Sequence, residues 1–590
     1  MDEAYNDEAY HEAPTDWDED DDPPRGARDP GARHGRPDGP GLARVRPSKA
    51  PPAGVAAPVG TVVSDDSSPS FFTLAFRLNA DAFTSPGRFV AVYVDHLLGR
   101  TRDDRDVLVL ARVDDVHEVN PHEDALSSTL NDVIPFGTEY APEGRSTVIY
   151  RLAAAEPLEE AVLDDAGQVV EVRSVETLPP AGAPVFQAGG ELTVRVLGLE
   201  QDPDAGLHVG SVHGDPAVPV VLGRGVIQRH MFIAGGIGTG KSYTRGVLAE
   251  ELQAWGVPQV NIDVNGELVE AAEELGGRNL VPGQDGFTLP LSALSSADVL
   301  EAVPSINPGT NMETLLRFAH ESLLKEVLQG RRDYFTVDDL VAHVDECAWT
   351  LEMTTGSGEN RKLDRRTVEP TKLRTQSLNR LPFLGRPFDW VANLTPGAIV
   401  NIDCRGLLLS ELRLITASVA RDLQSLARNR RIPFVALSVD EFHLVAPNND
   451  QVVTTQVLRE IARIGRHHKL GLILTTQSPA DVDRSILKRL LTRFLHAIEP
   501  DQLDALRGVF ADASADLVRS LPKLPQGVCI VTGAFETVRH ATVVRVRRRR
   551  TTHGGKTPDI WSDFAEAGWV GKRPAAPGGL AGGDDQGSGR

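Results

Sequence analysis

An apolar segment that runs into a glycine-rich turn and then a helix constrains the fold more than any other feature of this sequence. Residues 231–236 read MFIAGG, and residues 235–242 read GGIGTGKS, which fits the pattern G-x-x-x-x-G-K-[ST] in full. The apolar segment predicts a buried strand, and we expect a helix from Lys241 to about Trp255. A buried strand, a glycine turn and a helix in this order are typical of an α/β fold with a parallel sheet.

The residue types of this turn suit phosphate binding. Gly235, Gly238 and Gly240 let the backbone curl so that its N–H groups face phosphate oxygens, and the start of the helix adds a partial positive charge. Lys241 would neutralise the β- and γ-phosphates, and Ser242 would offer a hydroxyl to Mg²⁺. We therefore predict that ATP and Mg²⁺ are the cofactors, with nucleotide-binding residues Gly235, Gly236, Ile237, Gly238, Thr239, Gly240, Lys241, Ser242 and Tyr243.

Two further apolar strands end in polar residues. FVALSVDE (434–441) ends in Asp440 and Glu441, and LGLILTTQ (470–477) ends in Gln477. An acid at a strand end beside a phosphate loop can hold Mg²⁺, and an adjacent glutamate can activate the attacking water. We predict Asp440 as a metal residue with Ser242, Glu441 as the catalytic base and Gln477 as a γ-phosphate contact.

Two arginines are candidate contacts to the nucleotide. Arg466 lies near the end of an expected helix at 452–468, and Arg229 lies just before the phosphate-loop strand. A guanidinium near a subunit boundary can complete a neighbour's ATP site. The alternative is an ordinary surface arginine at each position, and the residues alone leave both readings open.

Changes in composition divide the chain into four parts. Residues 1–68 read as a disordered tail, because residues 2–22 hold eleven acidic side chains and no Lys or Arg. Residues 69–205 hold short strand-length segments such as FVAVYV (89–94) and LTVRVLG (192–198), which predict a small all-β barrel or sandwich. Residues 206–550 alternate strands and helices around a helical insertion at about 295–380, as in a P-loop (RecA-like) core. Residues 551–590 read as a brace followed by a flexible tail.

Composition excludes several other classes. The 590 residues carry a net charge of −22, which is incompatible with a uniformly basic nucleic-acid coat. The three cysteines stand far apart, so neither a disulfide framework nor a CxxC metal site is expected. No apolar run approaches the roughly 20 residues that cross a bilayer. We expect a cytoplasmic protein without a membrane partner.

Together these segments resemble the HerA branch of the HerA–FtsK ATPases. The resemblance rests on Arg229-His230, GGIGTGKS, DVNGE (263–267), VDEFH (439–443) and IARIGRHHKLGLIL (461–474) with TTQSPADVD (475–483). It implies a homo-hexameric ring that translocates double-stranded DNA with ATP, beside a NurA-type nuclease in DNA end processing. It assigns Arg466 to the neighbour's site and Arg229 to a nucleotide contact within its own subunit or near the interface. It gives Asp263 and Glu267 a role near Mg²⁺ or in coupling, and the alternative for this pair is a structural turn. VVRVRRRRTTHGG (543–555) resembles the segment with which the family braces a neighbouring subunit.

Two basic segments are candidates for DNA contact. They are RVRRRR (545–550) and the stretch at 361–374, but the first could equally pair with carboxylates. Two other functions remain open: a regulatory ATPase ring that controls an effector nuclease, and a DNA pump of the FtsK or conjugation type.

Overall fold

We describe the protein from a computed structural model. The structure describes residues 52–64, 68–119, 150–202, 204–284, 286–350, 352–354, 360–449, 452–464, 469–506, 513–533 and 538–554. The predicted tail residues 1–51 and 555–590 lie outside this part of the chain, as does Arg466.

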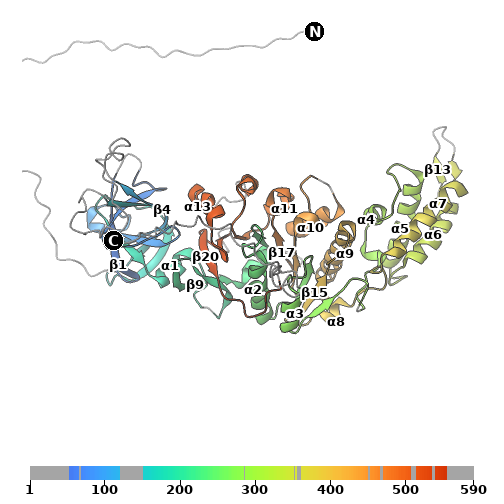
Figure 1. The fold of residues 1–590 in the computed structure, drawn as a ribbon, viewed down its shortest axis with the longest axis horizontal. Coiled ribbons are helices and arrows are strands. Elements are labelled where there is room, and N and C mark those ends of the chain that lie inside the picture. The colour runs from blue at the N-terminus through green and yellow to red at the C-terminus, as the bar shows by residue number, and fades with distance from the viewer. Residues whose placement is uncertain are drawn as a thin grey trace, which may run out of the picture. The chain divides into compact units, whose positions relative to one another are not determined.

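The N-terminal part of the described chain is an antiparallel barrel, drawn in blue in Figure 1. Its strands run in the order β2-β1-β7-β3-β4-β5-β6, and a second pairing of β2 with β5 closes the sheet on itself. Valine, leucine and alanine side chains such as Val92 and Val109 fill the interior together with Phe76. The bounds are β1 Val55–Val62, β2 Leu74–Leu78, β3 Phe89–Val94, β4 Val107–Val119, β5 Tyr150–Leu163, β6 Val169–Ser174 and β7 Pro184–Ala188.

The predicted all-β barrel is thus confirmed, with two differences in detail. β1 lies inside the predicted tail 1–68, because Val59 and Val62 of its VAAPVGTV sequence are buried in the barrel. LTVRVLG, predicted as a strand, is the end of helix α1 (Gly190–Leu197). Gly198 closes this helix in the left-handed conformation, and burial of Leu192, Val196 and Leu197 on one side outweighs the strand preference of its valines.

The second part of the described chain is an 11-stranded sheet with the order β12-β15-β11-β16-β17-β10-β18-β19-β20-β8-β9. The strands from β12 to β18 in this order are parallel, and β19, β20, β8 and β9 continue antiparallel. The P-loop core with a mostly parallel sheet is therefore confirmed. The bounds are β8 Gly206–Val212, β9 Asp215–Gly223, β10 Met231–Ala234, β11 Gln259–Asp263, β12 Arg278–Leu280, β15 Ile399–Asp403, β16 Val435–Val439, β17 Leu470–Thr476, β18 Thr492–Leu495, β19 Val528–Thr532 and β20 Thr542–Val546.

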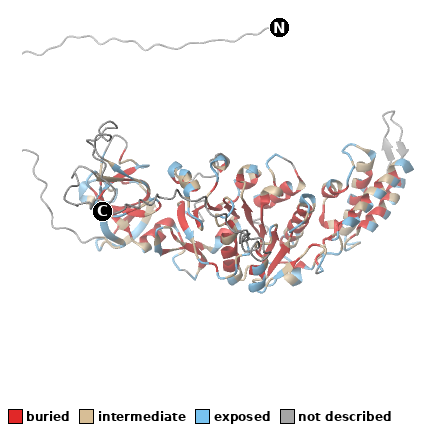
Figure 2. Cartoon of the chain, viewed as in Figure 1, coloured by how far each residue is buried: buried red, intermediate tan, exposed pale blue. Residues whose placement is uncertain are grey.

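Every residue of the central strands β10, β11, β16 and β17 is buried, as the red strands of Figure 2 show. Parallel strands are covered on both faces, and in β11 this burial extends to the polar side chains of Gln259, Asn261 and Asp263. The helices of this part are α2 Lys241–Ala254, α3 Val269–Glu274, α8 Trp390–Asn393, α9 Leu409–Arg428, α10 Val453–Ile464, α11 Arg484–Leu487, α12 Leu503–Leu506 and α13 Ala515–Ser520.

The predicted helical insertion lies between β12 and β15 in the chain. Ser295 caps α4 and Thr310 caps α5 by accepting backbone N–H bonds, as serine and threonine do at helix starts. Leu315, Leu340 and Val344 are buried where these helices pack. The elements are α4 Ser296–Ala302, α5 Asn311–Leu328, α6 Val337–Thr350, the hairpin β13 Glu352–Thr354 and β14 Asn360–Lys362, and α7 Arg365–Gln376.

The parallel pairing brings the ends of four strands to one edge of the sheet. Ala234 of β10 pairs with Thr476 of β17, and Ile262 of β11 pairs with Val439 of β16. The residues that follow these strands therefore meet at the carboxyl edge, which is where ligands bind in open α/β sheets.

Candidate functional site

The glycine-rich loop connects β10 to α2 at this edge. Gly238 has φ 72° and Gly240 has φ 124°, both in the region that favours glycine. A Cβ at Gly235 would come within 2.6 Å of the His496 Cβ, so this position also has no room for a side chain. Lys241 is 8% exposed, and its Nζ donates to the Gly236 carbonyl at 3.0 Å, which holds the ammonium over the loop.

A buried histidine, His496, packs against the glycine-rich loop. His496 Nδ1 lies 3.1 Å from the Val528 carbonyl and Nε2 lies 2.9 Å from the Thr244 hydroxyl, so Nδ1 donates and Nε2 accepts. Burial, with repulsion from Lys241, lowers the pKa of His496 to about 4. The imidazole is therefore neutral at pH 7 and links β18, β19 and α2 beneath the phosphate loop.

Asp440 and Glu441 follow β16 at the same edge. Glu441 has φ 43°, an uncommon conformation for a residue with a side chain and one that recurs at functional sites. Its Oε2 accepts the Gln477 backbone N–H at 3.3 Å and lies 3.3 Å from His443 Nδ1. Burial and the charge of Asp440 raise the pKa of Glu441 to about 7, against the opposing effects of Lys241 and the Gln477 N–H. Such a carboxyl is suited to proton transfer near neutral pH.

Arg245 is a buried residue that sequence reasoning missed. It is 2% exposed, with Nη1 3.2 Å from Asp440 Oδ2 and Nη2 3.4 Å from Asp263 Oδ1. Burial by itself would lower the pKa of this guanidinium, but the charges of Asp440 and Asp263 raise that pKa above its usual value. The available signal was its spacing, because Arg245 stands four residues after Lys241 and so on the same face of the helix.

Asp263 and Glu267 have different environments. Asp263 is fully buried and accepts the backbone N–H groups of Glu267 at 3.2 Å and Leu268 at 2.9 Å, which is a structural turn. Glu267 faces the nucleotide cavity described below. Burial raises the pKa of the Glu267 carboxyl, while a hydrogen bond from Ser242 lowers it.

These residues surround a cavity of about 910 Å³, which has room for a nucleoside triphosphate. It brings together the predicted Lys241, Ser242, Glu441 and Gln477. The lining is Ile237, Gly238, Gly240, Lys241, Ser242, Tyr243, Asn265, Glu267, Glu441, Gln477, Gln526, Gly527, Arg545, Val546, Arg548 and His553. Sequence reasoning did not anticipate the contributions from residues 526–527 and 545–553.

Arg229 is not among these residues, and Arg466 lies outside the described part of the chain. Arg229 ends the 3-10 helix Arg224–Arg229 before β10, at the end of that strand opposite to the phosphate loop. This places Arg229 away from the phosphate loop of its own chain, and a contact of Arg229 with a nucleotide near a subunit interface stays a prediction. His230 next to it is a packing residue, since its Nδ1 accepts the Leu472 N–H at 3.1 Å and burial lowers its pKa to about 4.

The arginine run after β20 is tied to α2 instead of being free for DNA. Arg547 donates to Glu250 at 2.8 Å and to Glu251 at 2.7 Å, and Arg550 donates to Glu251 at 3.1 Å. The carboxylate-pairing alternative is thus the correct one for these side chains. In the other basic stretch, Lys372 of α7 pairs with Asp345 at 2.5 Å.

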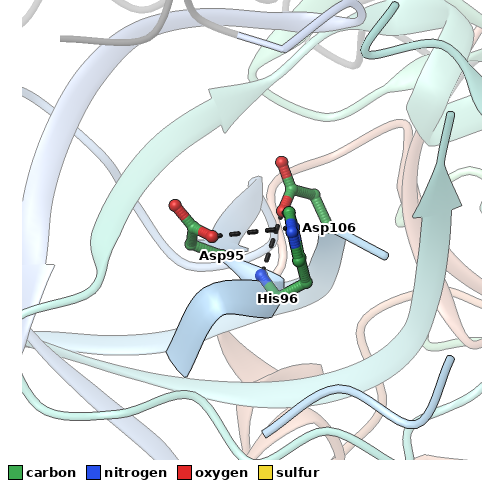
Figure 3. A group of neighbouring side chains, drawn as sticks. All are labelled: Asp95, His96 and Asp106. Atoms are coloured by element: carbon green, nitrogen blue, oxygen red, sulfur yellow. Dashed lines mark hydrogen bonds and ion pairs between the residues drawn. The ribbon is translucent and has the colours of Figure 1, made fainter. Parts of the chain in front are cut away.

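In the described part of the chain, one group of side chains has the proximity that a metal site requires. Figure 3 shows it in the barrel: Asp95, His96 and Asp106. Asp106 already accepts from His96 Nδ1 at 2.6 Å and from Tyr93 Oη at 2.5 Å, and Asp95 accepts the Leu97 N–H at 2.9 Å. Because these hydrogen bonds satisfy the group, we assign no metal to it.

The fold and the cavity define the class of protein, a P-loop ATPase. Residues 207–423 match the family model described as "Helicase HerA, central domain". This match confirms the resemblance to the HerA-type ATPases, and the chain is an ATP hydrolase, as the motifs predicted. Among the described residues, no helix combines the length and the apolar character that crossing a membrane requires.

Several known proteins are similar over most of the chain. The DNA double-strand break repair helicase HerA of Sulfolobus acidocaldarius is 24% identical over 410 residues, which cover 66% of this chain and 78% of the relative. The protein of the same name from Pyrococcus furiosus is 20% identical, covering 82% and 92%. Among solved structures, VirB4 of Thermoanaerobacter pseudethanolicus aligns with a TM-score of 0.47 at 15% identity, covering 59% of this chain and 98% of its own.

Proposed function

We propose that this chain is a ring-forming ATPase that translocates double-stranded DNA and acts with a nuclease in DNA end processing. The observation that carries the proposal is the cavity in which Lys241, Ser242, Glu441 and Gln477 meet, within a chain that is similar to DNA repair helicases. The ring is proposed as a homo-hexamer and the nuclease as one of the NurA type, which are the partners that the family resemblance implies.

Glu441 is the proposed general base. Its carboxyl faces the cavity and is fixed by the Gln477 N–H, so the ionised form can accept a proton from water that attacks the γ-phosphate. The Lys241 ammonium would neutralise the β- and γ-phosphates. The Gln477 side chain, which also lines the cavity, is proposed to report loss of the γ-phosphate to the rest of the subunit.

Ser242 and Asp440 are the proposed Mg²⁺ residues. The donors fit this ion, since Mg²⁺ prefers oxygen ligands, and Asp440 Oδ2 is buried without a hydrogen-bond partner apart from its ion pair to Arg245. When bound, Mg²⁺ would neutralise charge on the β- and γ-phosphates. Arg245 would hold the Asp440 carboxylate in place for the ion.

The first test is the ATPase rate with and without linear duplex DNA. We expect at least several-fold stimulation by duplex and no activity in Lys241→Ala, because the substitution removes the cation that binds the phosphates. Stimulation that falls steeply with salt would support a DNA channel, because contact with the DNA backbone releases counterions. A rate that depends on Lys241 but ignores duplex would favour a regulatory ring and contradict the motor.

A further inference from the structure

The five arginines of residues 545–550 divide into two groups with different surroundings. Arg547, Arg549 and Arg550 contact α2 or the segment that covers it. Arg545 and Arg548 are exposed and line the nucleotide cavity. Within the described part of the chain, no hydrogen bond or ion pair occupies either of these two guanidinium groups. The run thus has three side chains that anchor it and two that face the cavity.

The anchoring contacts hold the segment tightly against α2. The buried Glu250 carboxylate accepts the backbone N–H groups of Arg550 at 2.8 Å and Thr551 at 2.9 Å, besides its pair with Arg547. The Arg549 side chain is 1% exposed and lies where a Cβ of Gly246 would stand, 2.3 Å from its Cζ. A side chain at position 246 would overlap the Arg549 guanidinium, so glycine at this position lets Arg549 pack against the helix.

The segment is also tied to the phosphate loop. Val546 N–H donates to the Gly527 carbonyl at 3.0 Å, and Gly527 N–H donates to the Thr239 carbonyl at 3.0 Å. Gln526 Nε2 donates to the Gly238 carbonyl at 2.9 Å. Residues 545–548 are therefore fixed relative to the loop that receives the phosphates.

The sheet order places residues 545–548 on the side of β10 opposite to Glu441. β16 and β17, which carry Glu441 and Gln477, lie on one side of β10. β19, which follows Gly527, and β20, which contains Arg545, lie on the other side. A nucleotide whose γ-phosphate points to Glu441 therefore extends its α- and β-phosphates and its nucleoside toward the arginine side.

We propose that Arg545 and Arg548 bind the α- and β-phosphate end of the nucleotide in their own chain. The inference rests on the proposed ATPase site and adds two cations to it. Among the residues that line the cavity, Lys241, Arg545 and Arg548 supply positive charge against the carboxylates of Glu267 and Glu441. Guanidinium groups suit phosphate because their donors are planar and permanently charged.

The test is the Kd of a fluorescent ADP analogue for the full chain and its variants. We expect Arg545→Ala and Arg548→Ala each to raise the Kd about fivefold to twentyfold, with a smaller loss in Arg548→Lys. Arg550→Ala is the matched control, since it removes the same charge from the same segment at a side chain that pairs with Glu251 and does not line the cavity. Its Kd should stay within twofold of wild type.

Lys241→Ala separates this inference from the function on which it rests. If Lys241→Ala abolishes binding while the double variant Arg545→Ala/Arg548→Ala stays within twofold of wild type, the ATP site stands and the arginine assignment is overturned. If the wild-type chain binds no ADP, or binds it equally well without Lys241, the proposed ATPase site itself fails. If Arg545→Ala and Arg548→Ala lose affinity for ATP and keep their affinity for ADP, the placement of the arginines at the α- and β-phosphates is overturned.

Discussion

At the scale of single residues, the Glu441 carboxyl combines the features that a general base needs. It faces the nucleotide cavity, its backbone has φ 43°, and its pKa is raised to about 7. Glu441→Gln should keep nucleotide affinity, because the phosphate loop is unchanged, and should lose about 100-fold or more of the hydrolysis rate. Paired measurements of ADP binding and phosphate release check this. Normal turnover in the variant would remove Glu441 from the role of base.

Some site residues could be predicted from the sequence and others could not. Lys241 and Glu441 are recognisable because a local pattern, an apolar strand followed by a defined polar turn, specifies their chemistry. Arg245 and His496 depend on partners from distant segments, such as Asp440 for Arg245 and Val528 for His496. Such buried polar contacts exist only after the strands are ordered in the sheet, so no single stretch of sequence contains them.

At the scale of elements, α2 and the segment after β20 are held together by buried carboxylates. Glu250→Ala removes the acceptor for Arg547 Nη1 and for the N–H groups of Arg550 and Thr551. We expect the segment to detach more often and trypsin to cut within Arg547–Arg550 at least several times faster than in wild type. Time-resolved limited proteolysis measures the rate. An unchanged cleavage rate would mean that Glu250 does not hold the segment.

The α8–α9 contact contains a carboxyl that makes stability depend on pH. Burial raises the pKa of Asp422 in α9 to about 6, against a hydrogen bond from Trp390 Nε1 at 3.4 Å. The folded chain therefore holds an extra proton at this site between about pH 4 and pH 6, and the stability from it is lost as pH rises through that window. The difference in free energy of unfolding between Asp422→Asn and wild type should therefore grow by about 1–2 kcal/mol in favour of the variant from pH 5 to pH 8.

The check is the thermal unfolding midpoint of both chains at pH 5 and pH 8. The exposed Asp165→Asn serves as the control, with the same loss of a carboxyl on the surface. A midpoint difference between wild type and Asp422→Asn that is equal at the two pH values would contradict the assignment.

Element types were also predictable only where local and tertiary preferences agree. The largely apolar β16 and β17 and the loop before α2 were recognisable, since the burial of parallel strands leaves a clear pattern. LTVRVLG has a strand-like sequence, yet it forms the end of α1 because its apolar side chains pack along one helical face. β1 was hidden by its proline and alanines, and only its pairing with β2 and β7 makes it a strand.

At the scale of the whole molecule, the family resemblance implies that each ATP site needs a second subunit. In the described part of the chain, the cations on the cavity are Lys241, Arg545 and Arg548, and Arg229 lies at the far end of β10. Arg466 lies outside the described residues and is the arginine that the resemblance assigns to a neighbour's site. A ring in which Arg466 acts across the interface makes a specific prediction for mixed subunits.

Arg466→Ala and Lys241→Ala should each be inactive alone, since every interface then lacks either the arginine or the phosphate-binding lysine. Mixing the two should restore part of the ATPase rate, because some interfaces then combine an intact Lys241 from one subunit with an intact Arg466 from the next. Rates measured across mixing ratios, with Glu441→Gln in place of Arg466→Ala as the control that cannot be rescued, check the idea. Glu441 and Lys241 act in the same site of the same chain, so that control mixture stays inactive in any ring. Absence of rescue at every ratio of Arg466→Ala to Lys241→Ala would place Arg466 outside the neighbour's site.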